Sequence, residues 1–313
     1  MSDLDLKVRA SIQRLQDFQK DEGYYLAFSG GKDSIVCKAL LDMANVKYDA
    51  HYRVTSVDPP ELVRFIRDEH PDVERCVPRY ETRRGWEGKP ITMWNLIPWK
   101  LMPPTRLVRY CCQFLKEDGG DGRMTVTGVR WAESRNRQEN QGMITIMGRK
   151  AGRELKDDPD FTSTNRGGVI LTNDNTESRR TIEHCYKRLK TTINPIIDWE
   201  DQDVWDFIKA HGIHYCCLYD EGFTRLGCIG CPMARKRGRE LEFKRWPKYQ
   251  AMYLSTFEKM LEERHRRGKT CGSWRIGITA RDVYNWWMEY DILPGQIEID
   301  GWYNDYDDET DYF

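Results

Sequence analysis

Six consecutive residues early in the chain have the composition of a phosphate-binding loop: Ser29, Gly30, Gly31, Lys32, Asp33 and Ser34. The two glycines let the backbone curl so that successive N–H groups point into one concavity, and a helix that follows adds the positive end of its dipole. The lysine supplies a mobile positive charge, the serines supply hydroxyl donors, and the aspartate can contact Mg²⁺ or orient its neighbours. We therefore predict that this loop binds the phosphates of a nucleotide.

The spacing of the loop excludes two common nucleotide-binding motifs. It is not G-x-x-x-x-G-K-[ST], the phosphate loop of Walker ATPases, and it is not G-x-G-x-x-G, the signature of dinucleotide-binding folds. The alternative without function is a glycine turn that carries charged surface residues. The sequence therefore predicts a nucleotide-binding protein that belongs to neither of these two classes.

Ten cysteines are present, and six of them occur in close pairs: Cys111, Cys112, Cys216, Cys217, Cys228 and Cys231. Thiolates are soft ligands, and a CxxC spacing places two sulfurs on one metal or cluster. Four of these six are predicted to bind a [4Fe–4S] cluster, and zinc held by the same four thiolates is the alternative. The sequence does not choose the four. Cys37, Cys76 and Cys185 are predicted to be buried structural thiols.

The pattern of apolar residues predicts an α/β fold, because short β-prone runs alternate with helical periodicity. Strands are predicted over residues 24–28, 48–54, 124–129 and 192–197. Helices are predicted directly after the phosphate loop and over residues 3–20, 61–69, 201–211, 249–267 and 279–290. Residues 78–104 are predicted to be a long loop over the ligand site with a helix from about Thr105, and residues 148–180 a polar excursion.

Charge and hydropathy set limits on the setting of the protein. Lys plus Arg (49) and Asp plus Glu (50) nearly cancel, so the net charge of -1 argues neither for nor against nucleic acid. The N-terminus has no apolar signal core, and no run approaches the roughly 18 apolar residues of a membrane span. We predict a cytoplasmic protein without a membrane partner, and reduced thiols there favour metal binding over disulfides.

Basic residues are dense after the CxxC pair: Arg235, Lys236, Arg237, Arg239, Lys244, Arg245 and Lys248, with Trp246 and Tyr249 among them. Positive charge with interleaved aromatic rings is how a nucleic acid substrate would be held. An exposed helix face, balanced by neighbouring glutamates, is the alternative. Residues 300–313 are acidic and aromatic.

Four motifs follow one another in the order typical of one family. The loop after a strand resembles the signature of PP-loop ATP pyrophosphatases. Residues 127–137 are similar to G-[VL]-R-x-x-[EQ]-S-x-x-R, and residues 194–205 to NP-[IL]-x-x-W-x-x-x-D-V-W. Residues 218–232 resemble LYxxGxxRxGCxxCP. On these motifs the chain is identified as a member of the phosphoadenosine phosphosulfate (PAPS) reductase-like branch of that superfamily.

The resemblance implies an adenine-nucleotide α-hydrolase-like (Rossmann-like) fold, in which a parallel sheet has helices on both faces. It implies a catalytic domain over residues 1–235 and a helical C-terminal extension over 236–313. The residues that it assigns to nucleotide binding are the loop, Gly128, Arg130, Thr55 and Asp58, although Asp58 would equally cap the next helix. The residues that it assigns to catalysis are Lys32, Asp33, Arg130 and Arg137.

The resemblance also narrows the reaction. Family members that reduce activated sulfate have a catalytic cysteine near the C-terminus, whereas no cysteine follows Cys271 here. Their loops also tend to lack the Lys-Asp pair that this sequence keeps. We therefore predict ATP and Mg²⁺ as cofactors, attack of a substrate oxygen on the α-phosphorus, and release of pyrophosphate before sulfur is transferred.

The predicted acceptor of sulfur is a nucleic acid, DNA or tRNA. The sulfur would come from a donor such as a cysteine desulfurase, and an oligomer is expected. One alternative is a PAPS or adenylyl-sulfate reductase that uses an external thiol. Another is a nucleotide-binding component of a modification or defence system without turnover.

Overall fold

The computed structural model describes residues 2–117, 119–120, 122–185, 189–271, 274–291 and 293, without the side chains of residues 183–185. The chain divides into two compact units. The sheet unit comprises Met1–Arg53, Pro60–Cys76 and Gly119–Glu221, and the helical unit comprises Val54–Pro59, Val77–Asp118 and Gly222–Phe313. The predicted domain boundary after residue 235 stays a prediction, and the compact units divide the chain differently.

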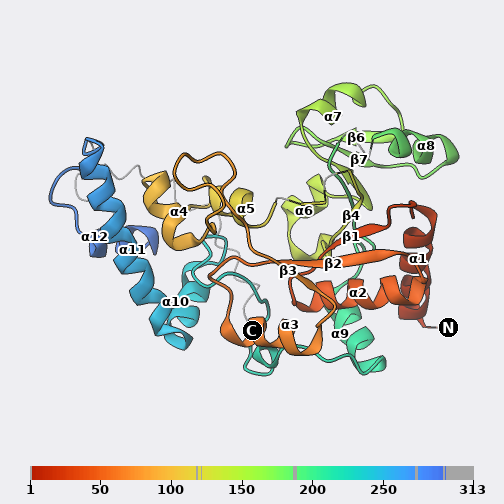
Figure 1. Cartoon of the computed structure of the whole chain (residues 1–313). Coiled ribbons are helices and arrows are strands. Elements are labelled where there is room, and N and C mark those ends of the chain that lie inside the picture. The colour runs from red at the N-terminus through yellow and green to blue at the C-terminus, as the bar shows by residue number, and fades with distance from the viewer. Residues whose placement is uncertain are drawn as a thin grey trace. The chain divides into compact units, whose positions relative to one another are not determined.

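The sheet unit contains eight strands: β1 (Tyr24–Ala27), β2 (Tyr48–Arg53), β3 (Glu74–Cys76), β4 (Thr125–Val126), β5 (Ile144–Ile146), β6 (Phe161–Ser163), β7 (Val169–Leu171) and β8 (Thr191–Ile193). Its helices are α1 (Asp3–Asp17), α2 (Lys32–Ala44), α3 (Pro60–Glu69), α6 (Arg135–Asn140), α7 (Arg149–Glu154), α8 (Thr176–Cys185), α9 (Asp201–Ala210) and the short 3₁₀ helices η1 (Trp131–Glu133) and η2 (Cys217–Tyr219). Figure 1 shows these elements along the chain.

The strands form one sheet in the order β3-β2-β1-β4-β8-β5-β7-β6. The five strands from β3 to β8 pair in parallel, and β5, β7 and β6 continue the sheet antiparallel. This confirms the predicted α/β fold with a mainly parallel sheet. The predicted polar excursion, residues 148–180, contains β6 and β7, whose short runs gave no clear alternation.

Helix α2 begins directly at the phosphate loop and sits against the sheet through buried residues at helical spacing: Ile35, Val36, Leu40 and Leu41. It ends at Asn45, whose φ of 53° is the left-handed conformation common after helix C-termini. Helices α1 and α9 both contact α2. The loop is therefore held at a fixed strand-to-helix junction.

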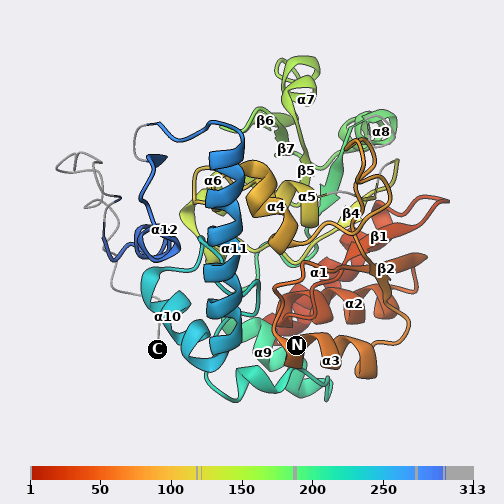
Figure 2. The same ribbon diagram turned by 60° about the vertical axis from the view of Figure 1, so that its left-hand side comes forward.

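The helical unit contains α4 (Met93–Lys100), α5 (Tyr110–Leu115), α10 (Lys236–Arg245), α11 (Pro247–Arg266) and α12 (Ala280–Trp287). The long α11 packs against α4, α10 and α12 (Figure 2). The prediction of one long loop over residues 78–104 was wrong where α4 lies, because Thr92 and Asn95 form a capping box that starts a helix despite Pro98 inside it. The helix predicted from about Thr105 begins at Tyr110.

One of the predicted basic surface residues is buried. Arg239 is 1% exposed and donates hydrogen bonds to the carbonyl oxygen of Trp287 and to Glu289. It therefore fixes the packing of α10 rather than contributing charge to the surface. Residues 300–313 lie outside the described residues. None of the helices described has the length and apolar character needed to cross a lipid bilayer.

Candidate functional site

The phosphate loop has a backbone conformation that favours glycine at position 30. Gly30 has a φ of 74°, and a Cβ there would lie 2.7 Å from the side chain of Ile66. Ser34 Oγ donates to the carbonyl oxygen of Gly31 at 2.9 Å and accepts from the amide of Ser29 at 3.3 Å. The serines thus hold the turn closed, and Gly31 is the N-cap of α2.

Tyr219, from η2, contacts the first turn of α2. Its hydroxyl oxygen accepts a hydrogen bond of 2.8 Å from the backbone amide of Lys32. This amide is one that an anion at the helix N-terminus would use. Burial raises the pKa of Tyr219, so the phenol stays neutral. Tyr219 was not among the predicted site residues, although it lies in the Leu-Tyr start of the last motif.

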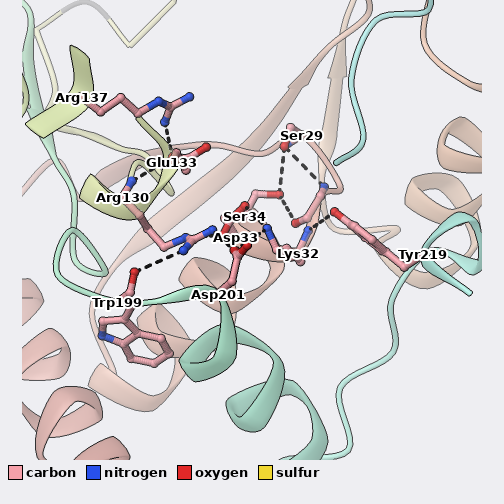
Figure 3. A network of polar contacts seen from close by, with 11 residues as sticks. Ser29, Lys32, Asp33, Ser34, Arg130, Glu133, Arg137, Trp199, Asp201 and Tyr219 are labelled. Atoms are coloured by element: carbon pink, nitrogen blue, oxygen red, sulfur yellow. Dashed lines mark hydrogen bonds and ion pairs between the residues drawn. The ribbon is translucent and has the colours of Figure 1, made fainter. Parts of the chain in front are cut away.

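Two cations and two carboxylates meet at the start of α2 (Figure 3). Lys32 Nζ lies 3.4 Å from Asp33 and 3.2 Å from Asp201. Arg130 donates to Asp33 Oδ1 through Nε at 2.7 Å and to Asp201 through Nη2. The predicted residues Lys32, Asp33 and Arg130 are therefore brought together. Asp201 joins them and was not predicted, because the matching motif contains Asp203 and not Asp201.

The charges of this cluster stabilise one another. Arg130 is 1% exposed, and burial opposes its charge, but the carboxylates of Asp33 and Asp201 outweigh burial and raise the pKa of Arg130. Burial likewise would raise the pKa of Asp201, yet the Lys32 and Arg130 cations hold it below its usual value. Arg130 and Asp201 are therefore both charged at neutral pH.

Arg137 lies at the edge of this cluster and not within it. Its guanidinium pairs with Glu133, which also accepts the backbone amide of Arg130 at 2.9 Å. The guanidinium of Arg130 further donates to the carbonyl oxygen of Trp199 at 3.2 Å. Glu133 and Trp199 thus orient Arg130 from both ends, and Arg137 orients Glu133.

Other residues of the motifs support the sheet. Asn194 is fully buried; it accepts from the hydroxyl of Thr127 and donates to the carbonyl oxygen of Gly142 at 2.7 Å. Asp203 accepts from the backbone amide of Glu200 in a capping box and pairs with Lys7. Asn194 thus joins the segments that follow β4 and β8 to the segment before β5, and Asp203 caps the start of α9.

Gly128 gives a prediction about how tightly this site is packed. A Cβ at Gly128 would lie 2.8 Å from Asp33 Cβ and 2.9 Å from its backbone carbon. We expect Gly128→Ala to lower the free energy of unfolding by about 1–3 kcal/mol, because the start of α2 must move. The matched control is Gly31→Ala, because a Cβ at Gly31 would lie no closer than 3.4 Å to its nearest neighbour, Tyr219 Oη. We expect this substitution to lower the free energy of unfolding by less than about 1 kcal/mol. Urea unfolding measures both, and equal losses would contradict the packing argument.

Asp201→Asn should destabilise the protein at neutral pH and much less in acid. The pKa of Asp201 is lowered in the folded protein, so its contribution is present above the unfolded pKa and is lost as the pH falls through the folded value. Because the side chain is 71% exposed, we expect a loss of about 1 kcal/mol or less. Urea unfolding across the acid range tests this against Asp206→Asn on the exposed face of α9. A loss for Asp201→Asn that does not shrink in acid would be evidence against it.

Thr55 and Asp58 belong to the helical unit. The carboxylate of Asp58 accepts from the amide of Thr55 at 3.0 Å, which closes the turn before α3. The thiol of Cys228 lies 3.5 Å from Thr55 Oγ1 and 4.0 Å from Asp58 Oδ1. Both predicted nucleotide contacts therefore lie beside a cysteine, and their contact with adenosine stays a prediction.

Four of the six paired cysteines line one cavity of about 30 Å³ in the helical unit: Cys111, Cys112, Cys228 and Cys231. Thr55, Lys116 and Tyr253 also line it. A tetrahedral zinc ion needs its ligand atoms about 4 Å apart. No three of these sulfurs, all in the described part of the chain, lie within 4.8 Å of one another.

The thiols and Lys116 interact electrostatically. The hydrogen bond that Cys111 donates to Cys112 raises the pKa of the donor and lowers that of the acceptor. Burial raises the pKa of Cys228 to about 11, and the nearby ammonium of Lys116 opposes this. The negative charge of a Cys228 thiolate in turn raises the pKa of Lys116. Lys116 was not among the predicted site residues, because it shares no motif with the cysteines.

The remaining cysteines are distributed differently. Cys216 is buried and Cys217 is exposed, and both belong to the sheet unit. Cys37 is fully buried, as predicted. Cys76 is only partly buried and lies 3.6 Å from His51 Nδ1, so the prediction of a buried structural thiol was wrong. The side chain of Cys185 lies outside the described residues.

The fold is an α/β fold with a mainly parallel sheet, and the glycine loop joins β1 to α2. Residues 23–234 match the phosphoadenosine phosphosulfate reductase domain, and the chain therefore belongs to the PAPS reductase-like family. This confirms the resemblance seen in the motifs.

Several curated proteins resemble shorter parts of the chain. It is 42% identical over 53 residues to the adenosine 5'-phosphosulfate reductase of Neisseria meningitidis, a match that covers 17% of this chain and 22% of that protein. It is 37% identical over 76 residues to an uncharacterized 37.8 kDa protein of Escherichia phage 186, covering 24% of this chain and 22% of that protein. An uncharacterized Methanocaldococcus jannaschii protein is 22% identical over 249 residues, which are 75% of this chain and 42% of that protein. The chain thus spans less than half the length of these relatives.

Two solved structures show similarity as well. One is the phosphate complex of the PAPS reductase from Candida auris, with 12% identity and a TM-score of 0.38 over 73% of this chain and 96% of that chain. The other is the Candida glabrata FMN adenylyltransferase in complex with FAD and inorganic pyrophosphate, with 13% identity and a TM-score of 0.38 over 73% and 66%. The family assignment follows from the domain match.

Proposed function

We propose that the chain adenylates an oxygen of a nucleic acid with ATP and prepares it for replacement by sulfur. The observation that carries the proposal is the cluster of Lys32, Asp33, Arg130 and Asp201 at the N-terminus of α2 (Figure 3). Two cations beside a helix N-terminus suit phosphates, and two carboxylates beside them suit a divalent cation.

The ion pairs of the cluster can be exchanged for those of a nucleotide complex. Lys32 and Arg130 would turn from the carboxylates to the phosphates. Asp33 and Asp201 would hold Mg²⁺, which when bound neutralises phosphate charge. No charge of the cluster would be left unpaired by this exchange. The hydroxyl of Tyr219 would yield the Lys32 amide to a phosphate oxygen.

The proposed reaction begins with attack of an acceptor oxygen on the α-phosphorus. The bond to the oxygen that bridges to the β-phosphate breaks, and pyrophosphate leaves. Lys32 and Arg130 would stabilise the negative charge that gathers on the phosphates, which is the main task in phosphoryl and nucleotidyl transfer. Hydrosulfide from an external donor then displaces AMP from the activated position.

The cysteine cavity supports the sulfur step. Four thiols around one cavity form a soft donor set, which suits a [4Fe–4S] cluster, with zinc as the alternative. Lys116 would balance the negative charge of the thiolates. Cys111, Cys112, Cys228 and Cys231 would hold such a cluster, which when bound would supply a site for sulfur chemistry.

The exposed basic residues on and near α10 support a nucleic acid acceptor: Arg235, Lys236, Arg237, Lys244, Arg245 and Lys248. Phosphate contacts of such residues give affinity that falls as the salt concentration rises. The proposal therefore includes binding of DNA or tRNA that weakens with salt.

Reduction of a sulfonucleotide is the second candidate function. The observation that favours it is the local identity to adenosine 5'-phosphosulfate reductases over 53 residues. In that reaction the cluster of Lys32 and Arg130 would bind the phosphate of a preformed substrate, and no ATP would be cleaved.

Pyrophosphate release separates the two functions. Anaerobically purified full-length protein is incubated with ATP and Mg²⁺, alone and with DNA, with tRNA or with sulfate. We expect pyrophosphate to appear in a nucleic acid arm. The second candidate predicts none in any arm, together with thiol-dependent turnover of PAPS or adenylyl sulfate, and that pair of results would overturn the proposal.

A further inference from the structure

A separate group of metal-ligand side chains lies on β2 and β3. One ligand atom each from His51, Glu74 and Cys76 lies within 4.8 Å of the others. The two strands pair in parallel, with His51 opposite Glu74 and Arg53 opposite Cys76. Because residues two apart on a strand point to the same face, the register brings these three side chains together. Their proximity therefore follows from the sheet itself.

Two of the three distances within this group match those of a zinc site. Bonds of about 2.0–2.1 Å to nitrogen, about 2.0–2.2 Å to oxygen and about 2.3 Å to sulfur put tetrahedral ligand atoms about 3.3–3.6 Å apart. His51 Nδ1 lies 3.2 Å from Glu74 Oε2 and 3.6 Å from Cys76 Sγ. A single nitrogen thus faces both other donors at the separations that one ion requires.

The other side of the imidazole is supported as in known metal sites. His51 Nε2 is hydrogen-bonded to Asp49, and Asp49 also accepts from Arg123. The ring of Tyr25 stacks on His51 with centroids 4.2 Å apart and an interplanar angle of 8°. A metal-binding histidine usually donates its second N–H to a carboxylate, which fixes the tautomer and the ring. The ring of His51 is therefore oriented with Nδ1 toward Glu74 and Cys76.

The alternative to a metal site is an ion pair of His51 with Asp49 and Glu74. That ion pair would explain the two carboxylates, but it would not explain why the thiol of Cys76 lies beside the same ring nitrogen. We propose that His51, Glu74 and Cys76 bind one Zn²⁺ ion, with water as the fourth ligand and Asp49 as the supporting carboxylate. The two anionic ligands neutralise the ion. Three protein ligands with one open position are the coordination of catalytic zinc sites, so the ion can accept a small anionic or neutral ligand. It also joins β3, the edge strand, to β2.

Metal binding by the full chain tests this site. The four-cysteine cavity is first removed as a competitor by Cys228→Ser and Cys231→Ser, and the protein is freed of metal with a chelator. In this background we expect one equivalent of Zn²⁺, and one equivalent of Co²⁺ with a thiolate-to-cobalt charge-transfer absorption. Adding Cys76→Ser should abolish that absorption, whereas Cys271→Ser, at an exposed cysteine, should leave it unchanged.

The supporting residues sharpen the test. Asp49→Asn should weaken Zn²⁺ binding about 10–100-fold and keep the absorption, and His51→Ala should weaken it by more than about 100-fold. Thermal unfolding without metal shows whether each variant folds. No stoichiometric zinc in the background protein, or an absorption that survives Cys76→Ser, overturns the site. Because the readout is metal binding, such a failure would leave the proposed ATP chemistry untouched.

Discussion

Lys32→Met is expected to slow pyrophosphate release from ATP by about 10²–10³-fold, the loss seen when one preorganised group that stabilises transition-state charge is removed. Lys32 is the cation that the loop itself supplies, and it is held over the start of α2 by Asp33 and Asp201. The fold should persist, because Arg130 continues to pair with both carboxylates. Initial rates of pyrophosphate formation at saturating ATP and nucleic acid measure the effect.

Lys38→Met is the matched control for this experiment. Lys38 lies on the same helix but pairs with Asp72 at 2.9 Å, outside the cluster. We expect its rate to stay within about twofold of the parent, since it touches no group that the reaction uses. If Lys32→Met keeps more than a tenth of the parent rate, the lysine does not stabilise the transition state and the proposed role of the loop fails.

The loop, the sheet and the arginine of the second motif could be predicted because each is encoded locally. Glycines directly after an apolar run leave few alternatives to a strand, a turn and a helix. Arg130 carries its own signal as a charged residue at the end of a strand. Asp201 carries no such signal in the sequence, because its role depends on where α9 begins relative to α2. A sequence motif gives the order of residues but not which of two nearby aspartates faces a cluster.

The same limit applies to Thr55, Asp58 and Cys76. The first two follow a strand end, which in an α/β sheet predicts a ligand contact. In the structure they adjoin Cys228, which is distant in the sequence and which no local pattern places beside them. Nothing in the sequence around Cys76 distinguishes it from an ordinary thiol. In the structure, the parallel register of β2 and β3 places it beside His51. Contacts between segments far apart in sequence decide all three cases.

Cys228→Ser is expected to remove most of the bound iron and sulfide from the anaerobically purified protein, whereas Cys217→Ser should keep it. The four cysteines that share a cavity include Cys228, and Cys217 belongs to the other unit. A [4Fe–4S] cluster corresponds to about four iron atoms per chain, which elemental analysis and labile sulfide measure directly. Loss of iron in Cys217→Ser as well would favour the alternative ligand set, and zinc without iron in the parent protein would exclude the cluster.

The phosphate loop and the cysteine cavity should also serve different steps of the reaction. The described partners of the phosphate loop (Figure 3) all belong to the sheet unit, and Cys228 is not among them. Pyrophosphate release by this variant should therefore stay within about threefold of the parent, while incorporation of sulfur into the nucleic acid stops. If pyrophosphate release falls together with sulfur incorporation, the cysteines would be needed to form the activated acceptor, and adenylation could not be treated as an independent first step.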